Sequence, residues 1–303
     1  AGARFDVRHP GGGSTRGRLP CDIAPHQPLL DVAGVRFTLP GGPVLRLDFE
    51  GEIFEMEDQR NWLDPSFKLY GRPLAQPAPY RIKDGECLEQ RVRIDVVAEL
   101  KSPVRVVPSR SGRCPAIGIA TAPGRVPADH ASVAALRELS PAFVLHRTDA
   151  RARGVAAAAQ LADALGARLR LETFGDGAAV ASAILQRKPE SVAPYFCGPR
   201  VNSALAKVGT AVTGGTFADF VMVNRNGIAV TADRATFAVC PTVHARDDRS
   251  LVETVMTLPQ IFAQARRIAR SRPLDVGPCS LRRRLSPRTG RPDVRPLPGE
   301  RGA

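Results

Sequence analysis

Three short apolar runs begin at residues 116, 142 and 167, a spacing of 26 and 25 residues. Helical periodicity follows the first two, near Ala128–Leu139 and near Arg153–Leu165, and the second stretch ends at Gly166. Strand–helix units of this length build a parallel sheet with right-handed crossovers. Further strands are predicted at Val192–Phe196, Gly209–Val212, Ala235–Cys240 and Leu274–Val276.

Seven strands at this spacing favour a (β/α)8 TIM barrel over an open dinucleotide-binding sheet. No GxGxxG motif follows the first strand, so the usual dinucleotide fingerprint is absent. The residues after Cys279 are mainly Arg, Pro and Gly and offer no eighth strand or helix. The sequence therefore predicts an α/β fold with an incomplete (β/α)8 TIM barrel.

The first 105 residues have a different period. Val44–Phe49 and Leu88–Val96 alternate apolar and polar residues, and Gly/Pro turns separate such runs. This pattern is typical of an antiparallel β-sandwich with one solvated face. We predict a partial β-rich domain at 1–105, the barrel without its last unit at 106–285, and an Arg/Pro-rich disordered tail at 286–303.

Of the net charge of +13, +8 lies in residues 266–303, and this run favours a solvated segment over a nucleic-acid site because aromatics are only 5% of the chain. No apolar stretch is long enough for a membrane span. The six cysteines are scattered without a CxxC pair, which disfavours a zinc site and a disulfide framework. We expect a cytoplasmic protein that uses neither a metal nor a cofactor.

Polar residues follow the ends of several predicted barrel strands, where the chemistry of such barrels takes place. A carboxylate or histidine there can act as a general base toward water, while arginine or asparagine stabilises the developing oxyanion, so the pattern suits hydrolysis. Asp149 and Arg147 could instead pair with each other, and His244 could be structural. The candidate catalytic residues are Arg147, Asp149, Glu172, Asn224 and His244.

The densest polar stretch runs from Glu50 to Trp62, outside the barrel. Alternation puts Glu55 and Glu57 on one strand face, where they repel each other unless a cation compensates. A sugar-binding surface, a packed domain junction and a solvated acidic edge strand all remain open. The candidate substrate-binding residues are Glu55, Glu57, Asp58, Arg60, Asn61, Trp62 and Lys68.

Several peptides resemble the bacterial D-apionate lactonase (D-apionolactonase) family. They are EMEDQRNW (Glu55–Trp62), DPSFKLY (Asp64–Tyr70), GGTFADF…NRN (Gly214–Asn226) and CPTVHARDDRSLVET (Cys240–Thr254). The resemblance implies an N-terminal β domain, a central TIM barrel and a C-terminal β domain. It also implies hydrolysis of D-apionolactone to D-apionate in the catabolism of apiose. Family members are about twice as long, so the resemblance indicates a partial or divergent member.

We therefore interpret the chain as a hydrolase that opens a small sugar lactone. Glu172 or His244 would activate water, Arg147 and Asn224 would polarise the lactone carbonyl, and Asp149 would orient Arg147. Two alternatives stay open. One is a glycoside hydrolase-like enzyme, which needs two carboxylates across a sugar. The other is an inactive carbohydrate-binding remnant of the family.

Overall fold

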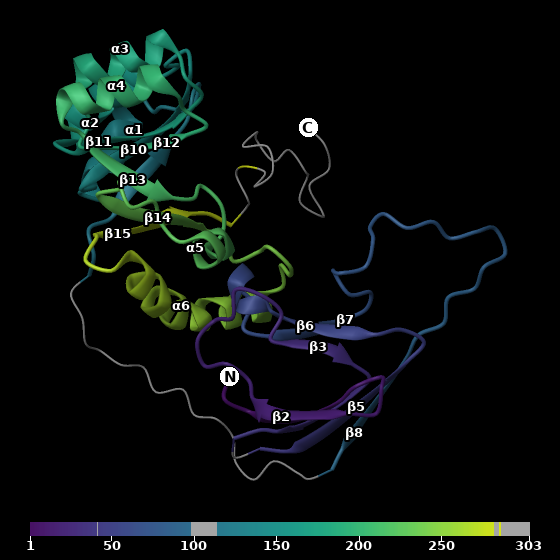
Figure 1. Cartoon of the computed structure of the whole chain (residues 1–303). Coiled ribbons are helices and arrows are strands. Elements are labelled where there is room, and N and C mark those ends of the chain that lie inside the picture. Colours follow the sequence, from purple (N-terminus) through teal and green to yellow (C-terminus); the bar gives the residue numbers. More distant parts are fainter. Residues whose placement is uncertain (41, 98–113, 282–284, 286–303) are drawn as a thin grey trace. The chain divides into compact units, whose positions relative to one another are not determined.

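The computed structural model describes residues 1–40, 42–97, 114–281 and 285 (Figure 1). The chain forms two compact units, and each has its own hydrophobic core. The first unit combines Ala1–Arg110 with Val243–Gln264, and the second combines Ser111–Thr242 with Ala265–Ala303. The sequence prediction had placed all of 106–285 in the barrel domain. The predicted disordered tail, 286–303, lies outside the described residues.

In its described residues the first unit contains two antiparallel sheets. Sheet A has the strand order β2-β1-β4-β5-β8, and sheet B has the order β3-β6-β7. The strands of sheet A are β1 (Arg4–Arg8), β2 (Ser14–Arg18), β4 (Gly34–Thr38), β5 (Val44–Glu50) and β8 (Arg91–Val96). Those of sheet B are β3 (Leu29–Val32), β6 (Phe54–Asp58) and β7 (Phe67–Tyr70).

The core of the first unit follows from the alternation in the sequence. Val35 and Phe37 of β4 and Phe49 of β5 are buried on one face of sheet A. Phe54 and Met56 of β6 belong to the same core cluster, so sheet B packs on that face. This confirms the predicted sandwich-like N-terminal part. We call this face of sheet A the inner face.

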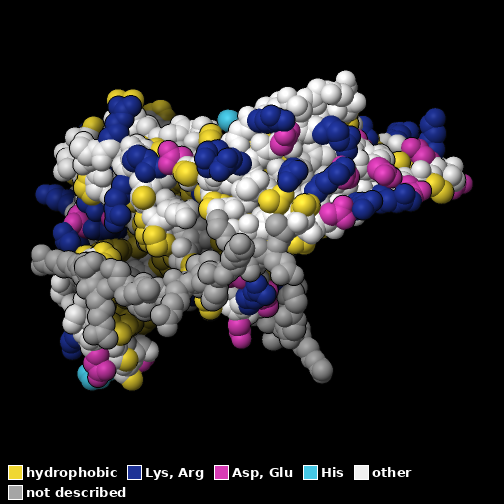
Figure 2. Space-filling model, turned by 90° about the horizontal axis from the view of Figure 1, so that it is seen from below, with side chains coloured by type: hydrophobic (Ala, Val, Ile, Leu, Met, Phe, Trp, Pro, Cys, Tyr) yellow, Lys and Arg dark blue, Asp and Glu magenta, His cyan; other side chains and the backbone are white. Residues whose placement is uncertain are grey.

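Charged residues alternate with the apolar ones and cover the outer face of sheet A. Arg16 pairs with Asp6 at 2.8 Å, and Arg46 pairs with Asp48 at 2.8 Å. Figure 2 shows basic and acidic side chains interspersed over the surface seen from below. Exposed pairs of this kind contribute little stability individually, but they keep the outer face soluble.

The second unit contains a parallel sheet of seven described strands in the order β15-β14-β13-β12-β11-β10-β9. All seven predicted strands are present, which confirms an incomplete barrel. They are β9 (Gly118–Thr121), β10 (Phe143–Asp149), β11 (Arg168–Phe174), β12 (Ser191–Tyr195), β13 (Ala211–Gly215), β14 (Arg234–Val239) and β15 (Leu274–Cys279).

An ion pair shows that this sheet is curled. Arg170 on β11 donates to Asp275 on β15 at 3.2 Å, although the two strands are four places apart in the sheet. Strands four places apart in a flat sheet would be separated by about 19 Å, beyond the reach of one arginine side chain. The sheet therefore bends into a nearly closed barrel, and Arg170 points into its interior.

Helices follow the strands as the periodicity predicts. Leu161 and Ala162 of α2 pack against Val144 of β10, and α2 ends at Gly166, whose φ is +63°. The helices are α1 (His130–Glu138), α2 (Val155–Leu165), α3 (Ala178–Arg187), α4 (Pro199–Val208), α5 (Phe220–Asn226) and α6 (Asp248–Ala269). In the described part of the chain, none of them is long and apolar enough to cross a membrane.

Helix α6 contributes most of its length to the first unit. Near its end, Gln264 accepts a hydrogen bond from the N–H of Ile23 at 2.6 Å and donates one to its carbonyl at 2.9 Å. At its start, the carboxylate of Asp247 accepts from the N–H of Ser250 at 3.0 Å. Asp247 therefore caps α6, whose first residue is Asp248.

Candidate functional site

The carboxyl ends of β10 and β11 bring two predicted catalytic residues side by side. Arg147 lies in register with Glu172, and neighbouring residues of a parallel pair share a face of the sheet. Glu172 lies two residues after Arg170, so its side chain points to the interior of the barrel as that of Arg170 does. Glu172 is only 3% exposed. A carboxylate and a guanidinium therefore share the interior face near the mouth of the barrel.

Asp149, the last residue of β10, is held by its own loop. Its carboxylate pairs with Arg153 at 2.6 Å and accepts a hydrogen bond from the N–H of Arg151 at 3.1 Å. Burial alone would raise its pKa, but these hydrogen bonds outweigh burial and keep the pKa of Asp149 below its ordinary value. Asp149 is thus an ionised residue that shapes the loop after β10.

His146 was not among the predicted site residues, yet it anchors the same loop. Its ring is fully buried between the hydroxyl of Thr121 and the carbonyl of Arg153, each at 2.9 Å. Burial lowers the pKa of His146, so the ring is neutral near pH 7. Gly154 lies against it, where a Cβ atom would come within 2.8 Å of the ring. In the sequence, the only indication that His146 holds this loop is its position one residue before Arg147.

Four aromatic rings cluster at the carboxyl ends of β11 and β12 and after β13. Phe174 and Tyr195 are the last residues of their strands, and their ring centroids are 5.3 Å apart. Phe217 lies 5.1 Å from Tyr195, and Phe196 lies 5.9 Å from Phe217. The carboxyl end of β12 is thus aromatic and not acidic. The rings make this part of the mouth apolar.

Cys197 is the thiol nearest to these rings in sequence, and its environment makes it a poor nucleophile. Its Sγ donates to the carbonyl of Gly175 at 3.3 Å and contacts the hydroxyl of Thr173 at 3.4 Å. Burial raises the pKa of the thiol, which keeps it protonated near pH 7. Catalysis by a cysteine nucleophile is therefore disfavoured at this site.

Asn224 does not lie at a strand end. Strand β13 finishes at Gly215, and Asn224 lies in the short helix α5, where it is half-buried. Its predicted role as a carbonyl-polarising group stays a prediction, and the supporting element is a helix that follows the strand rather than the strand itself.

The acidic segment of the first unit is built around a buried ion pair. Asp58 ends β6 and pairs with Arg60 at 2.7 Å, with side chains 0% and 4% exposed. Asp58 also accepts from the N–H of Ala24 at 2.9 Å, and Arg60 donates to the carbonyls of Pro20 and Cys21 at 2.9 Å. The pair therefore binds the 20–24 segment of the chain to the end of β6.

Asn61 and Glu55 are also hydrogen-bonded to other segments of the first unit. The amide of Asn61 donates to the carbonyl of Ala24 at 2.6 Å, and Asn61 is 1% exposed. Glu55, 2% exposed, accepts from the hydroxyl of Tyr70 and from the N–H of Leu74. Burial first, and the hydrogen bond to Glu55 second, raise the pKa of Tyr70 to about 12. These contacts tie β6 to β7 and to the loop that follows β7.

The other predicted binding residues keep exposed surface. Glu57 accepts from the indole N–H of Trp62 at 2.9 Å, and both are half-buried. The ring of Trp62 meets that of His244 edge-on at 6.3 Å between centroids. His244 Nδ1 lies 3.6 Å from the carboxylate of Asp64, and both side chains are about a third exposed. Lys68 is exposed on β7.

The predicted residues therefore fall into two groups. Arg147, Asp149 and Glu172 lie on neighbouring strands of the second unit. His244 belongs to the first unit, where it contacts Trp62. Among the described residues, no group of three His, Cys, Asp or Glu side chains could hold a metal ion. The roles assigned to these residues stay predictions.

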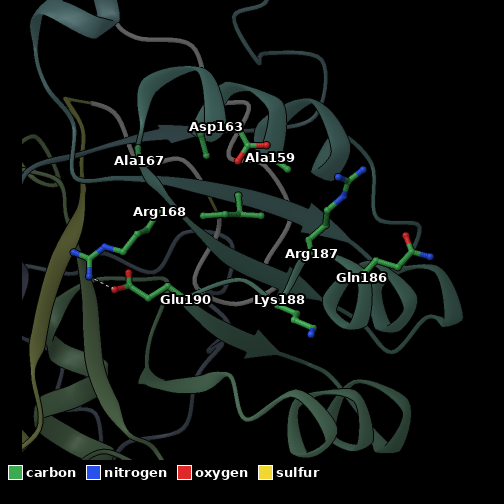
Figure 3. Close-up of a pocket in the computed structure, with 10 residues that line it drawn as sticks. Ala159, Asp163, Ala167, Arg168, Gln186, Arg187, Lys188 and Glu190 are labelled. Atoms are coloured by element: carbon green, nitrogen blue, oxygen red, sulfur yellow. Dashed lines mark ion pairs between the residues drawn. The ribbon is translucent and has the colours of Figure 1, made fainter.

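A pocket of about 420 Å³ lies at the opposite end of the barrel, between the ends of α2 and α3 and the start of β11. Figure 3 shows Arg168 pointing to Glu190, to which it pairs at 2.5 Å, whereas Arg187 and Lys188 point outward. Chemistry in these barrels takes place where the strands end. We therefore assign this pocket no catalytic role.

The fold defines a β-sandwich followed by an incomplete TIM barrel with polar and aromatic residues at its mouth. Two family models match the chain: "D-apionate lactonase, N-terminal domain" at residues 1–99 and "D-apionate lactonase, TIM barrel domain" at residues 186–298. A D-apionate lactonase of Brucella anthropi is 30% identical over 335 aligned residues, which include 95% of this chain. The chain belongs to the D-apionate lactonase family, as the resemblance indicated.

The chain spans about half of that relative, 54% of its length. Among solved structures, the crystal structure of the Bacillus cereus spore cortex-lytic enzyme SleL is similar over 59% of this chain and 55% of its own. The sequences are 12% identical there and the TM-score is 0.32, which is too low to support any inference about function.

Proposed function

We propose that this chain forms part of a hydrolase that opens a sugar lactone, D-apionolactone, to D-apionate. Membership of the family supports a lactonase, since the relative carries that name. The observation that carries the residue assignment is the register of Arg147 with Glu172 on the interior face of β10 and β11. In the attack of water on an ester carbonyl, a base accepts the proton of the water and a cationic donor stabilises the oxyanion.

In the proposed reaction, Glu172 removes a proton from a water molecule whose oxygen attacks the lactone carbonyl. Arg147 donates hydrogen bonds to the oxyanion that forms on the carbonyl oxygen. The ring C–O bond then breaks, and the leaving alkoxide takes the proton from Glu172. Lactone and water are consumed and one hydroxy acid is formed. General-base catalysis of this kind supplies about 10²–10⁴-fold.

The remaining predicted catalytic residues have supporting or alternative roles in this proposal. Asn224 is a second donor to the carbonyl oxygen, and His244 is the alternative base. Asp149 is a positioning residue that acts through Arg153, its partner at 2.6 Å, by fixing the loop after β10.

Substrate contacts in the first unit are proposed for the half-buried Glu57 and Trp62 and the exposed Lys68. Buried Glu55, Asp58, Arg60 and Asn61 would act on the substrate only through the scaffold that they hold. The partner is a small molecule. A reducing cytoplasmic location is proposed because all six cysteines are free thiols.

The test is Glu172→Gln, which keeps the shape of the side chain but removes the base. Proton release from D-apionolactone should fall at least about 10²-fold in kcat, with an unchanged circular-dichroism spectrum. Glu138→Gln, on the exposed surface of α1, is the matched control and should keep full activity. Wild-type activity in Glu172→Gln would remove Glu172 from the mechanism.

The presence of two carboxylates, Asp149 and Glu172, on adjacent strands keeps a glycoside hydrolase as the second candidate. There Asp149, held ionised by Arg153, would be the nucleophile, and buried Glu172 would be the acid. Turnover of an aryl glycoside without turnover of a lactone would favour it. Calorimetric binding of a sugar lactone without any turnover would instead identify a carbohydrate-binding remnant.

A further inference from the structure

The edge strand β8 leaves an apolar face uncovered. Val92, Ile94 and Val96 are 49%, 62% and 66% exposed, although they lie on the inner face of sheet A beside Phe49, which is 7% exposed. Sheet B has only three described strands against the five of sheet A. The sandwich core therefore ends at β5, and β8 extends beyond it.

The backbone of β8 is also open on its outer side. The N–H of Val97 donates to the carbonyl of Val44 on β5 at 2.8 Å. Because N–H and C=O groups alternate in direction along a strand, residues 91, 93, 95 and 97 bond toward β5. Val92, Ile94 and Val96 then direct their N–H and C=O groups to the free edge, where no described strand pairs with them.

Within the described residues, this edge carries charges only on its outer face and lacks the other usual protections against pairing. Soluble proteins blunt exposed edges with proline, lysine, bulges or inward-pointing charges. Between Arg91 and Val96 there is no proline or lysine, the register with β5 is continuous, and the inner face carries only aliphatic side chains. An edge with a regular register and an apolar inner face is suited to pairing with another strand.

We propose that β8 pairs antiparallel with β8 of a second copy of this chain, about a two-fold axis through Ile94. In this register Ile94 faces Ile94, and Val92 faces Val96 of the second copy. On the outer face, Arg93 faces Asp95 of the second copy, twice. The open N–H and C=O groups are those of the even-numbered residues, and this register pairs them with one another.

The neighbouring registers that keep this parity are unfavourable. A shift by two residues one way places Asp95 opposite Asp95. A shift the other way places Arg93 opposite Arg93 on the axis, and this repulsion offsets part of the attraction between Arg91 and Asp95 in that register. Like charges directly opposite each other destabilise a strand pair, whereas unlike charges stabilise it. The register centred on Ile94 is therefore the one that opposes unlike charges without opposing like charges, and this self-complementarity is what a symmetric interface requires.

The pairing joins two copies of sheet A into one sheet and merges the exposed side chains of both β8 strands into one apolar strip. A single strand pair buries less than the roughly 1,600 Å² of a standard interface, so we expect a dissociation constant on the order of micromolar. The dimer forms through the first unit and is independent of the proposed lactonase activity.

Sedimentation across protein concentrations tests the dimer with the full 303-residue chain. Arg93→Asp should weaken dimerisation about tenfold because Asp then faces Asp95, and Arg93→Asp/Asp95→Arg should restore it. Arg93 also pairs with Asp95 of its own strand at 3.0 Å, so Arg16→Asp is the control: it breaks a similarly exposed pair with Asp6 on β2, at the other edge of sheet A, and should leave the dimer unchanged. A monomer at about 100 µM, or a dimer that Arg93→Asp does not weaken, would overturn the proposal.

Disulfide trapping tests the register. Ile94→Cys places two cysteines on the axis with Cα atoms about 5.5 Å apart, within reach of a disulfide, whereas Val96→Cys places them far beyond reach. Under mild oxidation the first variant should form a covalent dimer, with the link between the two introduced cysteines mapped by mass spectrometry, and the second should not. Equal crosslinking of both, or of neither, would contradict the register. Protection of β8 amides from hydrogen exchange in a monomer would show that the chain covers its own edge.

Discussion

The acidic segment of the first unit (Glu50–Trp62) and the strand ends of the second unit differ in how their charged residues are brought together. In the first, Asp58, Arg60 and Asn61 are close in sequence and buried, and their polar groups bind other parts of the same chain. In the second, Arg147 and Glu172 are far apart in sequence and meet only through the register of two strands. A dense polar motif can thus be scaffold, while the residues of the proposed site are distributed over strand ends.

The largest effect should come from breaking the scaffold. Asp58→Ala leaves Arg60 buried without its carboxylate, and removing one partner of a buried pair costs about 3–5 kcal/mol. The free energy of unfolding of the first unit should fall by that amount. Urea denaturation followed by the fluorescence of Trp62, the only tryptophan, measures it within that unit.

Arg16→Ala is the comparison for this variant. It removes an exposed partner of Asp6 from the same unit, where the side chain of Arg16 is 81% exposed, and it should cost less than about 1 kcal/mol. Equal losses in the two variants would contradict a scaffold role for Asp58.

The second prediction concerns the barrel mouth, where a substitution should lower activity far more than stability. Arg147→Gln removes the cationic donor, and loss of one oxyanion donor costs about 10²–10³-fold in kcat. Stability should change far less than in Asp58→Ala. Initial rates of lactone opening and thermal unfolding of the same preparation separate the two effects.

Arg187→Gln supplies the matched control for this variant, because Arg187 lies at the other end of the barrel beside the pocket of Figure 3. It should retain wild-type rates. If Arg147→Gln also retained them, the barrel mouth would lose its proposed donor.

Periodicity predicted much of the fold because it reports which face of an element is buried. All seven barrel strands were found in this way, since each is an apolar run between helices. The membership of α6 in the first unit could not be predicted, because it depends on hydrogen bonds between Gln264 and Ile23, which are 241 residues apart. Nothing local in either segment encodes that contact.

The site was predictable only where strand ends determine it. Arg147, Asp149 and Glu172 were located from the ends of two strands, and their register follows from the parallel sheet. Asn224 was assigned to a strand end because α5 was not foreseen. The burial of Asp58 and Arg60 was not foreseeable, since a run of charges is usually solvated and these two are held by distant carbonyls.

A third prediction concerns the contact that joins β6 to β7. Tyr70→Phe removes the hydroxyl that donates to Glu55, and a hydrogen bond to a charged group contributes about 1.5–3 kcal/mol. Because the pKa of Tyr70 is raised to about 12, its contribution is present below pH 10 and is lost as the pH rises toward 12. Urea denaturation of both proteins should show a difference that shrinks across this alkaline range. A constant difference would contradict the assignment.

The smallest effect is expected at the rim of the barrel. Arg153→Ala removes the partner of Asp149, a pair in which Arg153 is 65% exposed, so it should cost under about 1 kcal/mol near neutral pH. The pKa of Asp149 is lower in the folded chain, so this stabilisation is present above the ordinary aspartate pKa and is lost as the pH falls through the folded value. Thermal unfolding of the second unit should therefore distinguish wild type from Arg153→Ala at pH 7 and not in strong acid. A larger loss in kcat than in stability at neutral pH would show that Arg153 positions the loop after β10, whereas a loss confined to stability would limit the pair to the scaffold.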